Sequence, residues 1–285
     1  MQQLSGVIPA MPTPLLENEN IDVAGVHKVV DYVIQQGASG IFVLGSMGEG
    51  PALVDEQKQI LVETAAAHIA GRVPLLAGIS DVSTRKAMEA GKVYQQSGAD
   101  YLVTTAPFYY KFPHPDSIVG YVSTLAEQLQ RPVVFYQVPS ASGNEVSFET
   151  LDTIFNLPNV GAVKYSSSDI HHLLELLRKY PDRDTRPGAL LQGDEFALDT
   201  AMLLGADGLV TGGGTLFIDT LVKLCNACWQ NDQIGAFQLQ QEFRNQMDTM
   251  LGPNLAVDWM FAIKNKLKEL GLCEDHVTRP FLKRD

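Results

Sequence analysis

Eight short, continuously apolar runs recur along residues 1–230, and a segment with helical periodicity follows each of them. Strands of a parallel sheet are buried on both faces and have this continuous apolar character. Alternation with amphipathic segments is typical of strand–helix units in which each helix crosses back over the sheet. The predicted strands are Gly6–Met11, Gly40–Gly45, Val73–Ile79, Tyr101–Ala106, Pro132–Tyr136, Val160–Val163, Ala189–Leu191 and Gly208–Thr211, and the predicted helices are Val23–Gln36, Asp55–Ile69, Ser83–Gln96, Asp116–Gln130, Ser147–Phe155, Asp169–Lys179, Glu195–Leu204 and Leu216–Trp229.

Eight strand–helix units in about 230 residues match the size of an α/β protein of the (β/α)₈ TIM barrel type. A doubly wound open sheet is the alternative, but eight regular units disfavour it. After the barrel, Asp232–Met250 and about Leu255–Leu270 are predicted to be helices, with no linker or low-complexity tract before them. We therefore expect a barrel over residues 1–230 and a C-terminal helical extension over 231–285 that belongs to the same domain.

The composition disfavours several classes of partner. A formal net charge of −12 is unsuited to a surface that binds nucleic acid or an anionic membrane. No apolar stretch approaches the roughly 18 residues of a membrane span, and Met1–Gly6 lacks the basic and apolar regions of a secretory signal. Three cysteines in 285 residues do not suggest a disulfide framework. We therefore expect a cytoplasmic protein.

Lys164 directly follows the apolar run that starts at Val160, where a charged side chain is unusual. TIM barrels carry their chemistry where the strands end, so a lysine at this position is expected to face the site. An ordinary lysine has a pKa near 10.4 and is almost wholly protonated at pH 7, whereas attack on a carbonyl group needs the neutral amine. Burial of the strand would favour that neutral form. From the residues alone, a lysine that extends from the strand end to solvent stays open as the alternative.

Two further strand ends supply candidate site residues. The segment Gly45–Gly50 is a glycine-rich turn before a helix, and its exposed amides suit a carboxylate or phosphate, although a plain strand–helix turn is the alternative. The order of its glycines is not that of the dinucleotide-binding fingerprint. Tyr136 can carry a proton or bond an oxyanion, unless it only packs with its hydroxyl in water. The same strand-end rule adds Thr211 as a substrate contact.

Two other motifs are interpreted as structural. Cys225 and Cys228 have the spacing of a redox pair but lie within a predicted helix near the end of the chain, which favours packing. His171 and His172 are adjacent on a predicted helix, and adjacent residues do not share a helix face, so a metal site there is not expected.

Four motifs stand in one order and spacing: Gly45-Ser-Met-Gly-Glu49, Pro107-Phe-Tyr-Tyr110, Tyr136-x-Val-Pro139 and Val163-Lys164. Together they resemble the dihydrodipicolinate synthase / N-acetylneuraminate lyase family, and the resemblance covers nearly the whole chain. Members of this family are pyruvate-dependent class I aldolases on a (β/α)₈ barrel. The resemblance implies a carbon–carbon lyase that uses a covalent Schiff base and needs no cofactor or metal. It also implies a homo-oligomer, with a tetramer of paired dimers expected.

Carried over by position, the resemblance implies roles for four catalytic residues. Lys164 is expected to form the Schiff base with pyruvate or another 2-oxo acid. Tyr136 resembles the tyrosine that shuttles protons to and from the substrate oxygen. Ser46 resembles the loop hydroxyl that positions the carboxylate and joins the proton relay. Tyr109 is similar to the tyrosine that completes this relay in a neighbouring subunit.

Departures from the family pattern bear on the substrate. Met47 replaces the second hydroxyl of the family's loop, so carboxylate binding is expected to rest on Ser46 and on backbone amides of the Met47-Gly48 turn. Dihydrodipicolinate synthases carry an arginine shortly after the Tyr-x-x-Pro motif, to hold a second carboxylate. The corresponding segment here, Ser140–Gly143, has no arginine. This argues against aspartate semialdehyde as a substrate.

Other positions resemble the lyases of sialic acid and other 2-oxo-3-deoxy sugar acids. Asp194 and Glu195 match the acidic pair with which these lyases bond substrate hydroxyls; a helix cap is the alternative. Ser166 stands where the lyases carry a hydroxyl near the aldehyde oxygen.

The predicted function is therefore a class I aldolase that reversibly cleaves a 2-oxo-3-deoxy sugar acid, such as N-acetylneuraminate or 2-oxo-3-deoxygluconate, to pyruvate and an aldehyde. Within the family, the alternative is a 4-hydroxy-tetrahydrodipicolinate synthase with another cationic anchor. From a different class, the alternative is a non-catalytic sensor of sugar acids, against which the joint presence of Lys164, Tyr136 and Ser46 argues. The aldehyde half, and the choice between dimer and tetramer, stay open.

Overall fold

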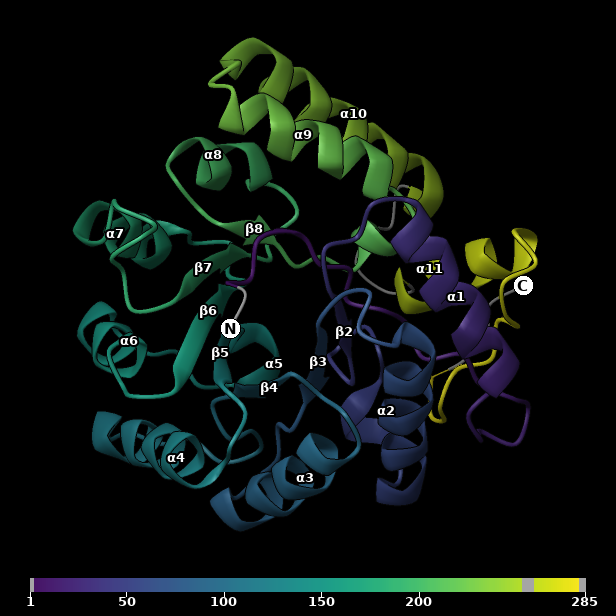
Figure 1. The fold of residues 1–285 in the computed structure, drawn as a ribbon, viewed down its shortest axis with the longest axis horizontal. Helices are drawn as coiled ribbons and strands as arrows, with labels where there is room; N and C mark the ends of the chain where they lie inside the picture. The colour runs from purple at the N-terminus through teal and green to yellow at the C-terminus, as the bar shows by residue number, and fades with distance from the viewer. Residues whose placement is uncertain (1–2, 253–258, 282–285) are drawn as a thin grey trace.

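The computed structural model describes residues 3–252 and 259–281 of the chain. Its centre is a barrel of eight parallel strands, hydrogen-bonded in the order β1-β8-β7-β6-β5-β4-β3-β2, and helices form an outer ring around it (Figure 1). The strands are β1 (Gly6–Val7), β2 (Ile41–Val43), β3 (Leu75–Gly78), β4 (Tyr101–Thr105), β5 (Val133–Gln137), β6 (Val160–Tyr165), β7 (Ala189–Gln192) and β8 (Gly208–Leu209). The predicted TIM barrel is confirmed.

The barrel closes between β2 and the residues that follow β1. Phe42 donates its backbone N–H to the carbonyl of Pro9 at 3.0 Å, and its own carbonyl accepts the N–H of Met11 at 2.8 Å. On the other side, Ile8 donates its N–H to the carbonyl of Leu209 at 2.8 Å. Because proline has no N–H to donate, Pro9 can only accept at this seam. The backbone bonds of Phe42 therefore carry the closure.

Helices follow the strands as the periodicity predicted. They are α1 (Val23–Gln35), α2 (Asp55–Ile69), α3 (Thr84–Gln96), α4 (Pro115–Gln128), α6 (Phe148–Phe155), α7 (His171–Lys179), α8 (Leu198–Leu203) and α9 (Ile218–Trp229), with a short α5 (Pro139–Ser142) and two 3₁₀ turns, η1 (Gly50–Ala52) and η2 (Gly213–Thr215). The side chains of Asp22, Ser83 and Ser147 accept hydrogen bonds from backbone N–H groups of the first turns of α1, α3 and α6. These are the cap residues expected at helix starts.

Two helices begin later than predicted, α7 after Asp169 and α8 after Glu195. The carboxylate of Asp169 accepts the N–H of His171 at 2.9 Å, and that of Asp194 accepts the N–H of Phe196 at 3.0 Å. Such local bonds of aspartate compete with the first turn of a helix. Both segments thereby remain loops at the carboxyl ends of β6 and β7.

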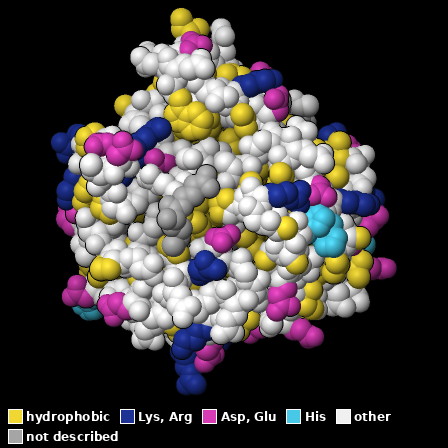
Figure 2. Space-filling model, viewed as in Figure 1, with side chains coloured by type: hydrophobic (Ala, Val, Ile, Leu, Met, Phe, Trp, Pro, Cys, Tyr) yellow, Lys and Arg dark blue, Asp and Glu magenta, His cyan; other side chains and the backbone are white. Residues whose placement is uncertain are grey.

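The C-terminal region adds α10 (Gln233–Leu251) and α11 (Trp259–Glu269). Helix α10 packs along α9 on the outside of the barrel (Figure 1). The predicted start of the last helix near Leu255 lies outside the described residues. No helix among residues 3–252 and 259–281 has the length and hydropathy of a membrane span. Acidic and basic side chains are interspersed over the face in Figure 2.

A buried ion pair joins the amino ends of β7 and β8. Arg186, whose side chain is fully buried, pairs with Asp207. The carboxylate of Asp207 also accepts the backbone N–H of Leu190 at 2.7 Å. Buried charges are tolerated when they are paired and hydrogen-bonded in this way. The pair therefore stabilises the amino-terminal end of the barrel, whereas the predicted active site lies at the carboxyl-terminal end.

A glycine-to-alanine pair tests the seam between β1 and β8. A Cβ on Gly208 would meet the backbone of Gly6, with the nitrogen at 2.8 Å, whereas a Cβ on the exposed Gly120 of α4 would meet nothing within 4 Å. We expect Gly208→Ala to lower the free energy of unfolding by about 1–3 kcal/mol through steric strain. Gly120→Ala should raise it by about 0.5–1 kcal/mol through helix propensity. Urea denaturation of both variants measures this, and equal effects would contradict the packing described.

Candidate active site

A cavity of about 900 Å³ opens at the carboxyl ends of the strands. Seven of the predicted site residues line it: Ser46, Met47, Tyr136, Lys164, Ser166, Asp194 and Glu195. Its lining also includes side chains that the sequence did not single out, among them Ala10, Glu145, Asp169, Phe196, Val210 and Trp259. Large cavities at this face are where TIM barrels bind small molecules.

Lys164 and Tyr136 are direct neighbours on adjacent strands. Their Cα atoms pair in the register of β5 and β6, so both side chains leave the sheet at the same height. Lys164 is 4% exposed and Tyr136 is 7% exposed. The Nζ atom lies 3.8 Å from the ring centroid of Tyr136 and 5.1 Å from that of Phe42, which reaches it from β2 across the barrel. Two aromatic rings thus enclose the amine, and among the described residues no carboxylate lies within ion-pair distance of it.

Gly193 allows the close packing beside Lys164. A Cβ at position 193 would meet the Ser166 hydroxyl and would lie 2.8 Å from Cε of Lys164. The Ser166 hydroxyl is itself buried and has no hydrogen-bond partner among the described residues. An unpaired buried hydroxyl next to the amine is suited to a polar group of a ligand. A single glycine at a strand end gave no signal of this role in the sequence.

The loop after β2 presents Ser46 to the cavity. Met47 is buried, and a Cβ added to Gly212 would lie 2.7 Å from its terminal methyl and 3.3 Å from the Trp259 ring. The predicted contact Gly48 does not line the cavity: it is packed on the backbone of Leu44, and its carbonyl accepts the hydroxyl of Thr13 at 2.5 Å.

Two more predicted residues lie outside the cavity lining. Thr211 is buried, and its hydroxyl accepts the N–H of Gly214 at 2.8 Å, which shapes the η2 turn. Tyr109 is 83% exposed, has a positive φ of 76°, and contacts Tyr110 edge to face at 4.9 Å. Tyr109 therefore does not contribute to the lining of the cavity in this chain.

Asp194 and Glu195 both face the cavity from the loop after β7, and neither caps α8. A carboxylate oxygen of Glu195 accepts the N–H of Gly213 at 2.7 Å. Burial raises the pKa of Glu195, while the Gly213 hydrogen bond and the charge of Lys164 oppose the rise. The loop after β7 is therefore held by Gly213, which follows β8, and its carboxyl oxygens can accept hydrogen bonds from hydroxyl groups of a ligand.

The charge of the lining is one-sided. Among the residues that the structure describes, four carboxyl groups line the cavity, those of Glu145, Asp169, Asp194 and Glu195, and Lys164 is the single cation. No arginine of the described residues lines it. Such a wall suits hydroxyl groups and is unsuited to a second carboxylate on the ligand.

The two motifs interpreted as structural lie outside the cavity. Cys225 and Cys228 are buried in α9, and burial raises the pKa of the two thiols to about 12 and about 11. Both therefore stay protonated and pack in the core. The exposed His171 pairs with Glu175 one turn along α7, at 3.7 Å.

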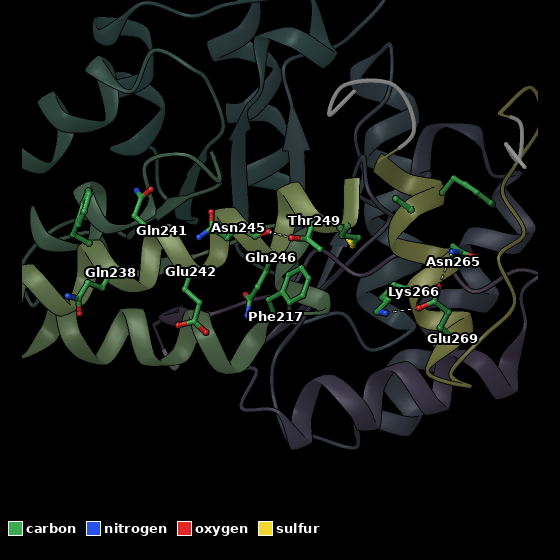
Figure 3. Close-up of a pocket in the computed structure, with 14 residues that line it drawn as sticks. Phe217, Gln238, Gln241, Glu242, Asn245, Gln246, Thr249, Asn265, Lys266 and Glu269 are labelled. Carbon is green, nitrogen blue, oxygen red and sulfur yellow. Dashed lines mark hydrogen bonds and ion pairs between the residues drawn. The ribbon is translucent and has the colours of Figure 1, made fainter. Parts of the chain in front are cut away.

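A second hollow of about 950 Å³ lies between α10 and α11 (Figure 3). Uncharged amide side chains such as Gln238, Asn245 and Asn265 dominate its labelled lining, beside the ion pair of Lys266 with Glu269. It contains none of the predicted site residues. The chemistry is therefore assigned to the cavity of Lys164.

Comparison with known proteins agrees with this geometry. The model of the dihydrodipicolinate synthetase family matches residues 3–285. A 4-hydroxy-tetrahydrodipicolinate synthase of Nitrosomonas europaea is 28% identical, over 97% of this chain and 91% of that protein. The structure of a dihydrodipicolinate synthase from Bacteroides thetaiotaomicron is similar with a TM-score of 0.92 and 28% identity, covering 100% of this chain and 95% of that one. YagE, a prophage protein of E. coli K12 in complex with pyruvate, is similar with a TM-score of 0.89 and 25% identity, over 100% and 94%.

The raised pKa of Glu195 predicts a pH-dependent effect of Glu195→Gln. The folded state binds this proton more tightly than the unfolded state, whose pKa is near 4.5, so the wild type loses stability as the pH rises through the folded pKa. Glutamine does not titrate and keeps an oxygen for Gly213. We expect the free energy of unfolding of the variant, relative to the wild type, to increase from pH 4.5 to pH 7 in urea denaturation. A difference that is constant or falls with pH would contradict the assignment.

Proposed function

Because the chain belongs to the dihydrodipicolinate synthetase family, we propose that it is a pyruvate-dependent class I aldolase that reversibly cleaves a 2-oxo-3-deoxy sugar acid to pyruvate and an aldehyde. The observation that carries the proposal is the position of Lys164, which is buried at the end of β6 beside Tyr136, faces the cavity and forms no ion pair with a carboxylate of the described residues. A lysine whose amine is enclosed and desolvated is a common nucleophile toward a carbonyl carbon.

The reaction begins at Nζ of Lys164, which attacks the 2-oxo carbon. Tyr136 gives its phenolic proton to the departing oxygen, and loss of water leaves an iminium ion and the phenolate of Tyr136. The positive nitrogen of the iminium ion accepts the electron pair of the C3–C4 bond as that bond breaks. Tyr136 takes the proton of the C4 hydroxyl, so that C4 leaves as an aldehyde. The remaining enamine is protonated at C3, and hydrolysis of the iminium releases pyruvate and the free amine.

The loop after β2 is suited to the carboxylate of the 2-oxo acid. Ser46 lines the cavity, and the turn continues through Met47 and Gly48, whose backbone N–H groups donate to no backbone carbonyl of the described residues. Met47 adds a hydrophobic surface in place of a second hydroxyl. In this proposal Ser46 and backbone amides bind the carboxylate.

Three observations support a sugar acid as the substrate. The carboxyl groups of Asp194 and Glu195 can accept hydrogen bonds from substrate hydroxyls, and the Ser166 hydroxyl is free to bond the aldehyde oxygen. Trp259 adds an aromatic surface to the lining, next to Met47 and Gly212. A polyhydroxylated chain has both hydroxyl groups and C–H faces, which such a cavity accommodates.

An oligomer is part of the proposal because Tyr109 is exposed and does not line the cavity of its own chain. If it completes the proton relay, it does so in the cavity of a neighbouring subunit. A tetramer of paired dimers fulfils this condition.

A second candidate function is 4-hydroxy-tetrahydrodipicolinate synthase, which the names of the curated relatives favour. That reaction joins pyruvate to aspartate semialdehyde, whose carboxylate would need a cation. Among the described residues, Lys164 is the only cation that lines the cavity, and the Schiff base occupies it.

Borohydride reduction in the presence of pyruvate tests the nucleophile. We expect the peptide that contains Lys164 to gain the mass of a reduced pyruvyl group, because the iminium is trapped as a stable amine. The peptide with Lys264, the other buried lysine of the described residues, should remain unmodified and serves as the internal control. Persistence of unmodified Lys164 peptide at saturating pyruvate would exclude the mechanism.

A substrate panel tests the reaction. We expect pyruvate release from N-acetylneuraminate or 2-oxo-3-deoxygluconate, and no condensation of pyruvate with aspartate semialdehyde, because the acidic lining repels a second carboxylate. Coupled assay of pyruvate, run alongside Lys164→Arg as the inactive control, measures turnover. Condensation with aspartate semialdehyde would instead support the second candidate. Binding without turnover of any compound would indicate a sensor.

A further inference from the structure

A buried ion pair lies directly behind the loop that carries Ser46. Glu49 ends this loop, and its carboxylate pairs with Lys264 of α11; the side chains are 0% and 1% exposed. The second carboxylate oxygen accepts the N–H and the hydroxyl of Thr278, at 2.6 and 2.7 Å. Nζ of Lys264 also donates to the carbonyl of His276 at 2.6 Å. Three segments far apart in the sequence thus meet at one carboxylate.

The pair is the anchor of a tight turn. Glu49 adopts a left-handed backbone with a φ of 53°, which a side chain rarely adopts without support. The N–H of Glu49 donates to the carbonyl of Ser46 at 3.2 Å, and that of Gly50 donates to the carbonyl of Gly45 at 3.1 Å. Since Glu49 does not line the cavity, its carboxylate holds the loop from behind while Ser46 faces the ligand.

The same pair also fixes one wall of the cavity. Helix α11 begins with Trp259, which lines the cavity beside Met47, and Lys264 lies on the same helix. Burial lowers the pKa of Lys264, and the charge of Glu49 opposes the decrease. Apolar residues of similar volume are often as stabilising as a buried ion pair, so stability alone does not explain the charges. The charges are explained by their effect on geometry, because the ion pair fixes the distance between the loop and α11.

We propose that Glu49 and Lys264 are positioning residues, whose ion pair holds the loop 45–50 at the place where Ser46 and the backbone amides bind the carboxylate of the 2-oxo acid. The identity of this ligand rests on the function proposed above. Neither residue touches the reacting atoms. The pair acts on the affinity for pyruvate through the loop, and Thr278 supports it.

The test measures the pyruvate concentration at which borohydride trapping of Lys164 is half-maximal, on the full-length chain. The double variant Glu49→Gln/Lys264→Met removes both charges and leaves no charge buried alone. We expect its half-maximal concentration to rise about tenfold or more, since small misplacements of binding groups have effects of this size. The matched control is Arg186→Met/Asp207→Asn, which removes the buried pair at the other end of the barrel and should leave the concentration unchanged.

A milder pair of variants covers the case in which the double variant does not fold. Thr278→Val removes only the hydroxyl that donates to Glu49, and Thr278→Ser keeps it. We expect the valine variant to require more pyruvate than the serine variant, at equal maximal trapping. Melting temperatures recorded in parallel identify the variants that are folded.

The outcomes separate this inference from the proposed function. If the wild type is not trapped at any pyruvate concentration, the proposed function fails. If the wild type is trapped and the folded double variant needs no more pyruvate, the positioning role is overturned. A rise of the same size in the Arg186/Asp207 control also overturns it, because the effect then follows from general loosening. Equal values for Thr278→Val and Thr278→Ser overturn it when the double variant is unfolded.

Discussion

The register between β5 and β6 is the constraint on which the rest of the site depends. Parallel strands that pair Tyr136 with Lys164 send both side chains out at the same end of the barrel, a few ångströms apart. Closure of the sheet then brings Phe42 of β2 to the other side of the amine. A one-residue slip would turn the lysine away from the interior and into the packing against the helices. The hydrogen bonds of the sheet therefore position the nucleophile before any loop does.

The buried cations of the barrel occupy two kinds of environment. Arg186 and Lys264 are each paired with a carboxylate, at opposite ends of the sheet, and each joins segments that are distant in the sequence. Lys164 is enclosed by aromatic rings and meets no carboxylate of the described residues within ion-pair distance. Pairing stabilises a charge and fixes a structure, whereas the absence of a partner leaves an amine available for chemistry. The contrast distinguishes the structural cations of this chain from the reactive one.

The C-terminal helices contribute to the site as well as to the outer surface. Trp259 forms part of the cavity wall, and Lys264 and Thr278 hold the carboxylate of Glu49 behind the loop of Ser46. The lining of the cavity consequently combines hydrophobic residues, Met47 and Trp259, with acidic residues, Asp194 and Glu195. This combination bears on which aldehyde the chain would accept.

The sequence by itself determined the barrel, because the alternation of apolar runs and amphipathic segments is a local pattern that can be recognised without any tertiary contact. It also indicated Lys164, Tyr136 and Ser46, since each directly follows or ends a predicted strand and the carboxyl ends of barrel strands meet at one face. Only the tertiary structure decided that Trp259 lines the cavity, that Gly193 makes room beside the lysine, and that Gly48 and Thr211 support the backbone. The bond from Thr278 to Glu49 spans 229 residues of sequence. No periodicity or motif predicts such a contact, because it forms only when the closed barrel brings the loop after β2 against the C-terminal segment.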